Sequence, residues 1–181
     1  MRRAFRFQPT RAWSFLRVSV PTLICAMLMA LPARAEGWMY AGFLGLGTGL
    51  EGSDAGTGTM SWQRARLRLS TGVDLRSDED DLQGFGFRGV FELEKRGSFG
   101  GEVRYSRWLG RGFGAYAGVC GTFVPETLVG GTVGATLLLP FGKRGGLFLE
   151  PSFAALPLGS DLADNSVLFW GLLTLGVNVN L

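Results

Sequence analysis

Apolar and polar side chains alternate along most of the chain after residue 36. Successive side chains of a β-strand point to opposite faces, so a period of two predicts strands with one apolar face and one polar face. Clusters of Gly, Asp, Ser and Pro separate the alternating segments, as expected of turns. The pattern predicts eight strands, over residues 38–48, 60–76, 82–94, 98–109, 112–124, 127–140, 146–156 and 167–181.

The alternation is clearest in segment 60–76. One face collects the odd-numbered residues Ala65, Leu67, Leu69, Thr71, Val73 and Leu75. The opposite face collects Arg64, Arg66, Arg68, Ser70, Gly72, Asp74 and Arg76. Four segments after it and the last segment divide in the same way, whereas segment 38–48 is too apolar to orient and segment 146–156 is mixed.

Glycine supports an all-β fold. All 29 glycines follow residue 36, and each glycine costs a helix about 1 kcal/mol relative to alanine. Eight antiparallel strands of this kind close into a barrel in one of two ways. A soluble lipocalin-like barrel turns its apolar face inward around a ligand, whereas a membrane barrel turns it outward toward lipid.

Charged residues on the polar faces favour the membrane barrel. Basic and acidic residues stand opposite the apolar face in mid-strand, and the basic ones are arginines, which suit a crowded and poorly hydrated interior. The predicted lumen charge network consists of Arg64, Arg66, Arg68, Arg88, Glu92, Glu94, Glu102, Arg104 and Glu150.

Aromatic residues near the predicted strand ends agree with this assignment. Amphipathic rings gather at the headgroup depth of membrane proteins. The predicted interfacial aromatics are Trp38, Tyr40, Trp62, Trp108, Phe113, Phe123 and Phe141.

The first 35 residues differ from the remainder and predict a signal peptide. They hold six arginines and no acidic residue, with an apolar run over 18–31 and the small residues Ala33 and Ala35 before Glu36. An uncleaved anchor is the alternative, but the run is shorter than the roughly 20 residues of a spanning helix. We therefore expect a signal peptide over 1–35 and a barrel over 36–181. Without the six arginines the chain is slightly acidic, which argues against nucleic acid as a partner.

The last residues, "TLGVNVNL", alternate up to the end of the chain. Thr174, Gly176, Val179 and Leu181 match the spacing of the C-terminal assembly signal of bacterial outer-membrane barrels, although Leu181 stands where most such families have Phe or Tyr. With the eight segments and the leader, the chain resembles the small eight-stranded outer-membrane barrels, the group of the OmpA transmembrane domain and OmpX.

That resemblance implies an all-β, closed, eight-stranded, antiparallel up-and-down transmembrane β-barrel after a cleaved signal peptide, with a lumen packed with side chains. It also implies Sec-type export to the outer membrane of a Gram-negative bacterium. Periplasmic chaperones and the barrel-assembly machinery would be partners during biogenesis, and outer-membrane lipid and lipopolysaccharide would surround the folded protein.

Catalysis is not expected. The chain has no histidine, so the histidine–serine mechanism of membrane-barrel acyl hydrolases and acyltransferases is excluded. Glu92 and Glu94 share a face, but nearby arginines would hold both ionised. Cys120 is the one cysteine outside the leader and faces the lumen by parity, so the mature chain can form no internal disulfide. No cofactor or metal is expected.

A structural or surface-interaction role in the outer membrane is therefore the leading hypothesis, with residues 49–59 and 156–166 as the longest exposed loops. Two alternatives stay open: a narrow channel for ions or small solutes, and a soluble lipocalin-like barrel that binds a lipophilic molecule. The oligomeric state is left open by the sequence.

Overall fold

The computed structural model describes residues 38–54, 59–77, 83–94, 97–110, 112–142, 144–160, 162 and 166–181. The predicted signal peptide, residues 1–35, lies outside the described residues, as does the side chain of Trp38. Within the described ranges, no helix has the length and apolar character needed to cross a bilayer.

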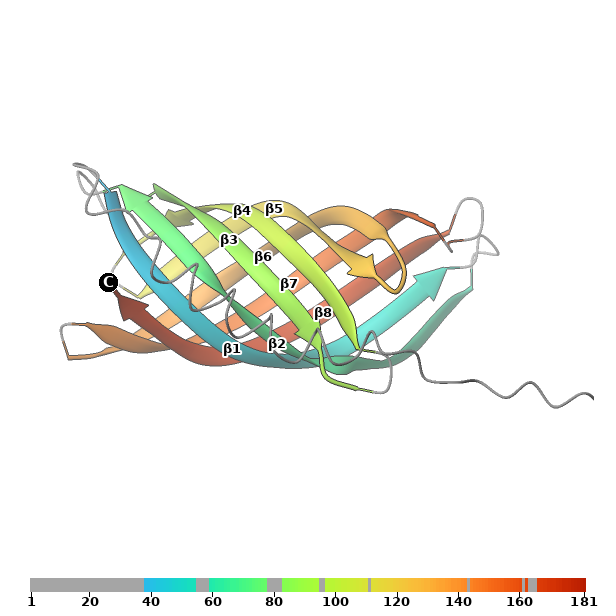
Figure 1. Cartoon of the computed structure of the whole chain (residues 1–181), viewed down its shortest axis with the longest axis horizontal. Coiled ribbons are helices and arrows are strands. Elements are labelled where there is room, and N and C mark those ends of the chain that lie inside the picture. The colour runs from blue at the N-terminus through green and yellow to red at the C-terminus, as the bar shows by residue number, and fades with distance from the viewer. Residues whose placement is uncertain are drawn as a thin grey trace, which may run out of the picture. The chain divides into compact units, whose positions relative to one another are not determined.

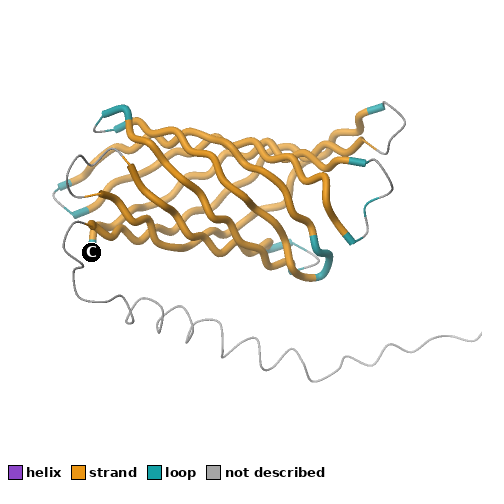
Figure 2. Tube along the Cα trace, turned by 90° about the horizontal axis from the view of Figure 1, so that it is seen from above, coloured by secondary structure: helices purple, strands orange, loops and turns teal. Residues whose placement is uncertain are grey.

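The described chain forms one closed barrel of antiparallel strands (Figures 1 and 2). The strands are β1 (Trp38–Asp54), β2 (Met60–Ser77), β3 (Gln83–Glu92), β4 (Ser98–Trp108), β5 (Phe113–Val124), β6 (Leu128–Phe141), β7 (Gly145–Gly159) and β8 (Val167–Asn180). Each strand pairs with the next along the chain, and β1 pairs with β8 from Ala41↔Asn180 to Asp54↔Val167. The predicted all-β, closed, eight-stranded, antiparallel architecture is confirmed.

The predicted strand bounds agree with the structure to within a few residues, with two exceptions. Strand β1 continues to Asp54 and β7 continues to Gly159, so each runs into a segment predicted as loop. The connections β1–β2, β3–β4, β5–β6 and β7–β8 share one end of the barrel, which we call the β1–β2 end.

The two faces of the barrel wall differ as the alternation predicts. Large apolar side chains cover the outside: Val103 and Leu175 are 52% and 59% exposed. Charged side chains fill the inside, where Arg104 is 3% and Glu150 is 5% exposed. The apolar face is therefore the outer face, and the barrel encloses its ionic side chains.

One β-bulge interrupts the alternation in β2. Gly47 pairs with Arg68 but Gly49 pairs with Ala65, so two residues of β2, Arg66 and Leu67, lie opposite Thr48 alone. A shift of one residue exchanges the two faces of a strand. The residues of β2 between the bulge and the β1–β2 end therefore point to the face opposite to the one that the alternation predicts. Ala65 is accordingly fully buried, which corrects its predicted outward orientation.

Candidate functional site

Glu150 is the hub of the lumen. Its Oε1 accepts a hydrogen bond from Arg88 at 3.0 Å and its Oε2 lies 2.9 Å from Nη1 of Arg104. Tyr116 and Thr136 donate their hydroxyl hydrogens to the same carboxylate at 3.2 and 3.0 Å. Arg88 comes from β3 and Glu150 from β7, so this contact crosses the lumen between strands that are not neighbours. A carboxylate buried this deeply requires such charge-assisted bonds.

Two more carboxylates lie beside the same arginines at longer distances. Asp74 is 3.6 Å from Arg88 and 3.8 Å from Arg104. Glu102 is 3.8 Å from Nη1 of Arg104, and its buried Oε1 has no hydrogen-bond partner within the described ranges. Glu102 is therefore the less well paired of the lumen carboxylates.

A second ionic cluster lies nearer the β1–β2 end. Arg68 donates from Nε and Nη2 to Oε1 of Glu92 at 3.1 and 2.8 Å, and Arg66 donates to Oε2 at 2.8 Å. Arg68 and Glu92 are buried, whereas the side chain of Arg66 is 43% exposed. The bulge places Arg66 at the opening, where it still reaches the buried carboxylate.

Four arginines inside the barrel lie over aromatic rings, an arrangement in which the ring face attracts the cation. The pairs are Arg68–Trp170 at 3.7 Å, Arg76–Trp108 at 4.2 Å, Arg88–Phe43 at 3.6 Å and Arg104–Tyr116 at 4.1 Å from guanidinium carbon to ring centroid. Hydrogen bonds hold the edges of the Arg68 and Arg88 guanidinium groups, and aromatic rings cover one face of all four.

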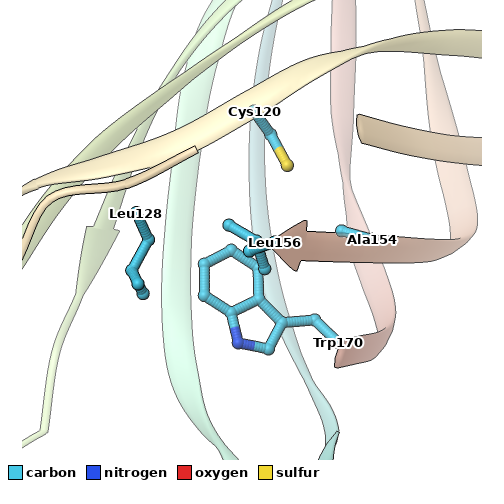
Figure 3. Packing of buried hydrophobic residues seen from close by; sticks show 5 residues of the cluster. All are labelled: Cys120, Leu128, Ala154, Leu156 and Trp170. Carbon is cyan, nitrogen blue, oxygen red and sulfur yellow. The ribbon is translucent and has the colours of Figure 1, made fainter. Parts of the chain in front are cut away.

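An apolar cluster occupies another part of the lumen (Figure 3). Leu156 lies against the indole of Trp170, and Leu128, Ala154 and Cys120 surround them. Trp170 also donates from Nε1 to Glu51 at 3.1 Å, and its ring lies under Arg68, which links the apolar cluster to the second ionic cluster. Cys120 lies on the lumen face, as predicted, and is buried.

A cavity of about 60 Å³ lies between the two ionic clusters. All eight strands contribute to its wall, which includes Arg68, Arg88, Glu92, Glu102 and Glu150. Since one water molecule needs about 10–15 Å³, the cavity has room for a few water-sized groups and no large solute. The lumen is therefore mostly filled by side chains.

Six of the nine predicted network residues face the lumen. They are Arg68, Arg88, Glu92, Glu102, Arg104 and Glu150. Arg66 joins them through Glu92 from the opening.

Arg64 and Glu94 require a correction, because they form a separate pair at the rim. Arg64 lies beyond the bulge and pairs with Leu50, whose side chain is on the outer face, so the bulge turns Arg64 outward. Glu94 follows the last residue of β3, and Nη2 of Arg64 donates to both of its oxygens at 2.7 Å. This hydrogen bond from Arg64 holds the pKa of Glu94 below its usual range.

The predicted interfacial aromatics mostly lie outside. Exposed rings at strand ends belong to Trp62, Phe113, Phe123 and Phe141, and Tyr40 is partly exposed. Trp108 is a correction: it is 7% exposed and lies inside the barrel under Arg76. Its neighbour across the ladder is Gly114, and a Cβ there would lie 3.0 Å from the indole, so the glycine makes room for the ring.

The four residues of the predicted C-terminal signal are divided between the two faces of β8. Val179 and Leu181 are exposed on the outside, whereas a Cβ at Gly176 would lie 2.6 Å from the ring of Phe148. Recognition of this segment by assembly machinery stays a prediction.

Several residues of the site were not singled out from the sequence. Asp74, Tyr116, Thr136 and Trp170 all lie on the polar face by parity, which was the available signal. Their contacts run across the lumen, and a pattern along single strands does not reveal which strands face one another.

No group of three or more carboxylates and cysteines within the described ranges could hold a metal ion. Comparison of the chain with models of known protein families found no match. Comparison with curated proteins also found no match.

Proposed function

We propose that this protein is a small barrel of the bacterial outer membrane, of the OmpA and OmpX type, with a structural or surface-interaction role and no catalytic reaction. The observation that carries the proposal is the sidedness of the wall, with apolar side chains outside and ion pairs inside. In water this arrangement would expose a broad apolar surface, whereas in a bilayer the same surface meets hydrocarbon.

The contacts of the lumen support the absence of catalysis. The carboxylate of Glu92 accepts hydrogen bonds from Arg66 and Arg68, and that of Glu150 accepts one from Arg88 and lies 2.9 Å from Arg104. A general acid or base needs a proton that it can exchange with substrate, and these carboxylates are committed to their partners.

The test is a substitution on the outer face. Val103 lies in the middle of β4, between Phe87 and Val119, which are also exposed. Val103→Arg should cost about 2–4 kcal/mol of folding free energy in lipid vesicles, because the charge would face hydrocarbon near the bilayer midplane. Leu158→Arg is the matched control at the end of β7, where the cost should be about 0–1 kcal/mol.

Folding is measured by urea titration, with unboiled gel mobility reporting the closed barrel. Equal and small effects of both substitutions would contradict membrane insertion. Fractionation of cells then tests the soluble alternative, since a lipophile-binding barrel would appear in the supernatant without detergent.

A narrow channel is a second candidate, which the cavity in the lumen favours. Its volume of about 60 Å³ suits ions and small solutes rather than large ones. Planar-bilayer recording would support this candidate if steady conductance appears and changes in an Arg68→Ala variant. Silence at all voltages would contradict it.

A further inference from the structure

Arg107 is a charged residue on the apolar outer face of the barrel. It alternates with Val103 and Tyr105 along β4, and like them it is exposed. The arginines of the two ionic clusters and of the rim have carboxylate partners. By contrast, the side chain of Arg107 forms no ion pair or hydrogen bond with any residue of the described ranges. The part of the protein that the structure describes therefore supplies no counter-ion for this charge.

The position of Arg107 along β4 sets its depth in a bilayer. Val103 lies in mid-strand, and Arg107 follows it by four residues toward the end of the barrel opposite to the β1–β2 end. Four residues span about 13 Å of strand, which a strand tilt of about 40° converts to about 10 Å of depth. With Val103 near the bilayer midplane, the guanidinium group lies close to the edge of an apolar band about 25 Å tall. At that depth an arginine side chain extends its charge toward the lipid headgroups.

The neighbours of Arg107 differ on its two sides. On β3, Gln83 lies directly across the ladder, and its Oε1 accepts a hydrogen bond of 2.8 Å from the hydroxyl of Tyr105. On β5, Ala115 lies across from Arg107 and Ala117 lies across from Tyr105. Both alanines are exposed on the outer face. Their short side chains leave the β5 side of Arg107 open and form an apolar surface that leads from the charge toward the middle of the barrel wall.

A phospholipid has groups that match both parts of this surface. The planar guanidinium group of an arginine can donate two parallel hydrogen bonds to one phosphate. The acyl chains of the same lipid can lie on the exposed alanines and bury apolar area there, whereas a free anion cannot. The positive charge of Arg107 favours a headgroup with a net negative charge.

We propose that Arg107 binds the phosphate of an anionic phospholipid such as phosphatidylglycerol, with an acyl chain against Ala115 and Ala117. Tyr105 and Gln83, which are joined by their hydrogen bond, border the phosphate on the β3 side. The site rests on the proposed membrane role and adds to it a preferred lipid headgroup at one end of the barrel.

The experiment measures folding in two lipid mixtures. The protein is folded into vesicles of phosphatidylcholine, either alone or mixed with phosphatidylglycerol of the same chain length, and unboiled gel mobility establishes that the barrel has closed. Urea titration then gives the folded-to-unfolded ratio in each mixture. Phosphatidylglycerol should raise this ratio about fivefold more for the wild type than for Arg107→Ala, because the variant lacks one arginine contact with an anionic lipid.

Arg144→Ala is the matched control. Arg144 is an exposed arginine at the same end of the barrel, but it lies in the turn between β6 and β7. The control should keep the wild-type response to phosphatidylglycerol. Arg107→Glu should respond in the opposite direction, so that phosphatidylglycerol stabilises it less than Arg107→Ala. Native mass spectrometry in a neutral detergent should show phosphatidylglycerol bound to the wild type and lost from Arg107→Ala.

Three results would overturn the site. One is an equal response of the wild type and Arg107→Ala, which would assign the charge to an internal partner such as the acidic residues 78–81, which lie outside the described residues. The second is an equal loss of response in Arg144→Ala, which would indicate a general attraction between basic residues and the anionic surface. The third is stabilisation of the barrel by inorganic phosphate in detergent without lipid, which would make the ligand a free anion.

Failure of the site and failure of the proposed function are distinguishable. A barrel that closes in phosphatidylcholine vesicles but gives one of these three results keeps its membrane role and loses the lipid site. A chain that closes in neither lipid mixture refutes the membrane role itself.

Discussion

Two ion-pair regions of this barrel differ in their surroundings: the lumen centre around Glu150 and the rim pair of Arg64 and Glu94. The rim contact is the shorter, at 2.7 Å against 2.9–3.0 Å for the arginine contacts of Glu150. Yet the side chains of the rim pair are 64% and 37% exposed, whereas those of Arg88 and Glu150 are 4% and 6% exposed. Water competes at the rim and not at the centre, so burial rather than distance should rank the two regions.

The largest effect should come from removing Glu150. Glu150→Ala leaves Arg88 and Arg104 buried without their nearest carboxylate, which should cost about 3–5 kcal/mol of the free energy of unfolding. Urea titration in detergent or lipid measures the loss. Glu150→Gln keeps the shape and some hydrogen bonds, so it should fall between wild type and the alanine variant. A loss for Glu150→Ala no larger than that for a rim variant would refute the ranking by burial.

Arg68 should come next. Arg68→Ala removes both hydrogen bonds to Oε1 of Glu92 and the stacking on Trp170, but Arg66 still reaches Glu92. We expect a cost of about 3 kcal/mol, at the lower end for a broken buried pair. Arg68→Lys retains the charge without the planar guanidinium group. In the same titration its free energy of unfolding should therefore lie between those of the wild type and Arg68→Ala. Full recovery would mean that the stacking geometry is unimportant.

Arg64 and Arg68 are only four residues apart in β2, but the side chain of Arg64 is exposed and that of Arg68 is buried. The reactivity of a cysteine at each position measures this difference directly. In a Cys120→Ser background, Arg64→Cys should react with a water-soluble maleimide at least about tenfold faster than Arg68→Cys, because only the former lies at the exposed rim. Mass spectrometry over time gives the two rates. Equal rates would contradict the bulge between them.

The smallest effect should come from the rim pair itself. Glu94→Gln should leave the urea midpoint at neutral pH unchanged within error, because the pair is solvated. The pKa of Glu94 is lowered in the folded state, so any contribution of its charge is present above the ordinary glutamate pKa and is lost as pH falls through the folded value. Wild type and variant should therefore converge in acid. A clear loss at neutral pH would contradict the contrast with Glu150.

The charged residues on the polar faces predicted which face lies inside. Alternation along the chain was enough to predict the eight strands and which residues share a face, because a strand places neighbouring residues on opposite sides. It failed at the bulge, since Ala65 and Arg64 lie in an unbroken pattern and nothing in it marks the extra residue at Arg66 and Leu67. Trp108 shares the parity of Glu102 and Arg104, so alternation places it inside; the prediction of an interfacial ring was wrong there, and Gly114 leaves the space that the indole occupies. Contacts across the lumen, such as Arg88 to Glu150, depend on barrel closure and strand tilt, which local patterns do not contain.

The ladder between β1 and β8 has a consequence for the order of assembly. It joins residues from opposite ends of the described chain, Ala41 with Asn180, so it closes the longest loop in the fold. The seven hairpins can form from near neighbours, but until this seam pairs, both edges keep unsatisfied backbone groups. Closure should therefore be the slow, cooperative step, and a barrel interrupted before it would behave as an open sheet that is prone to pair with other chains.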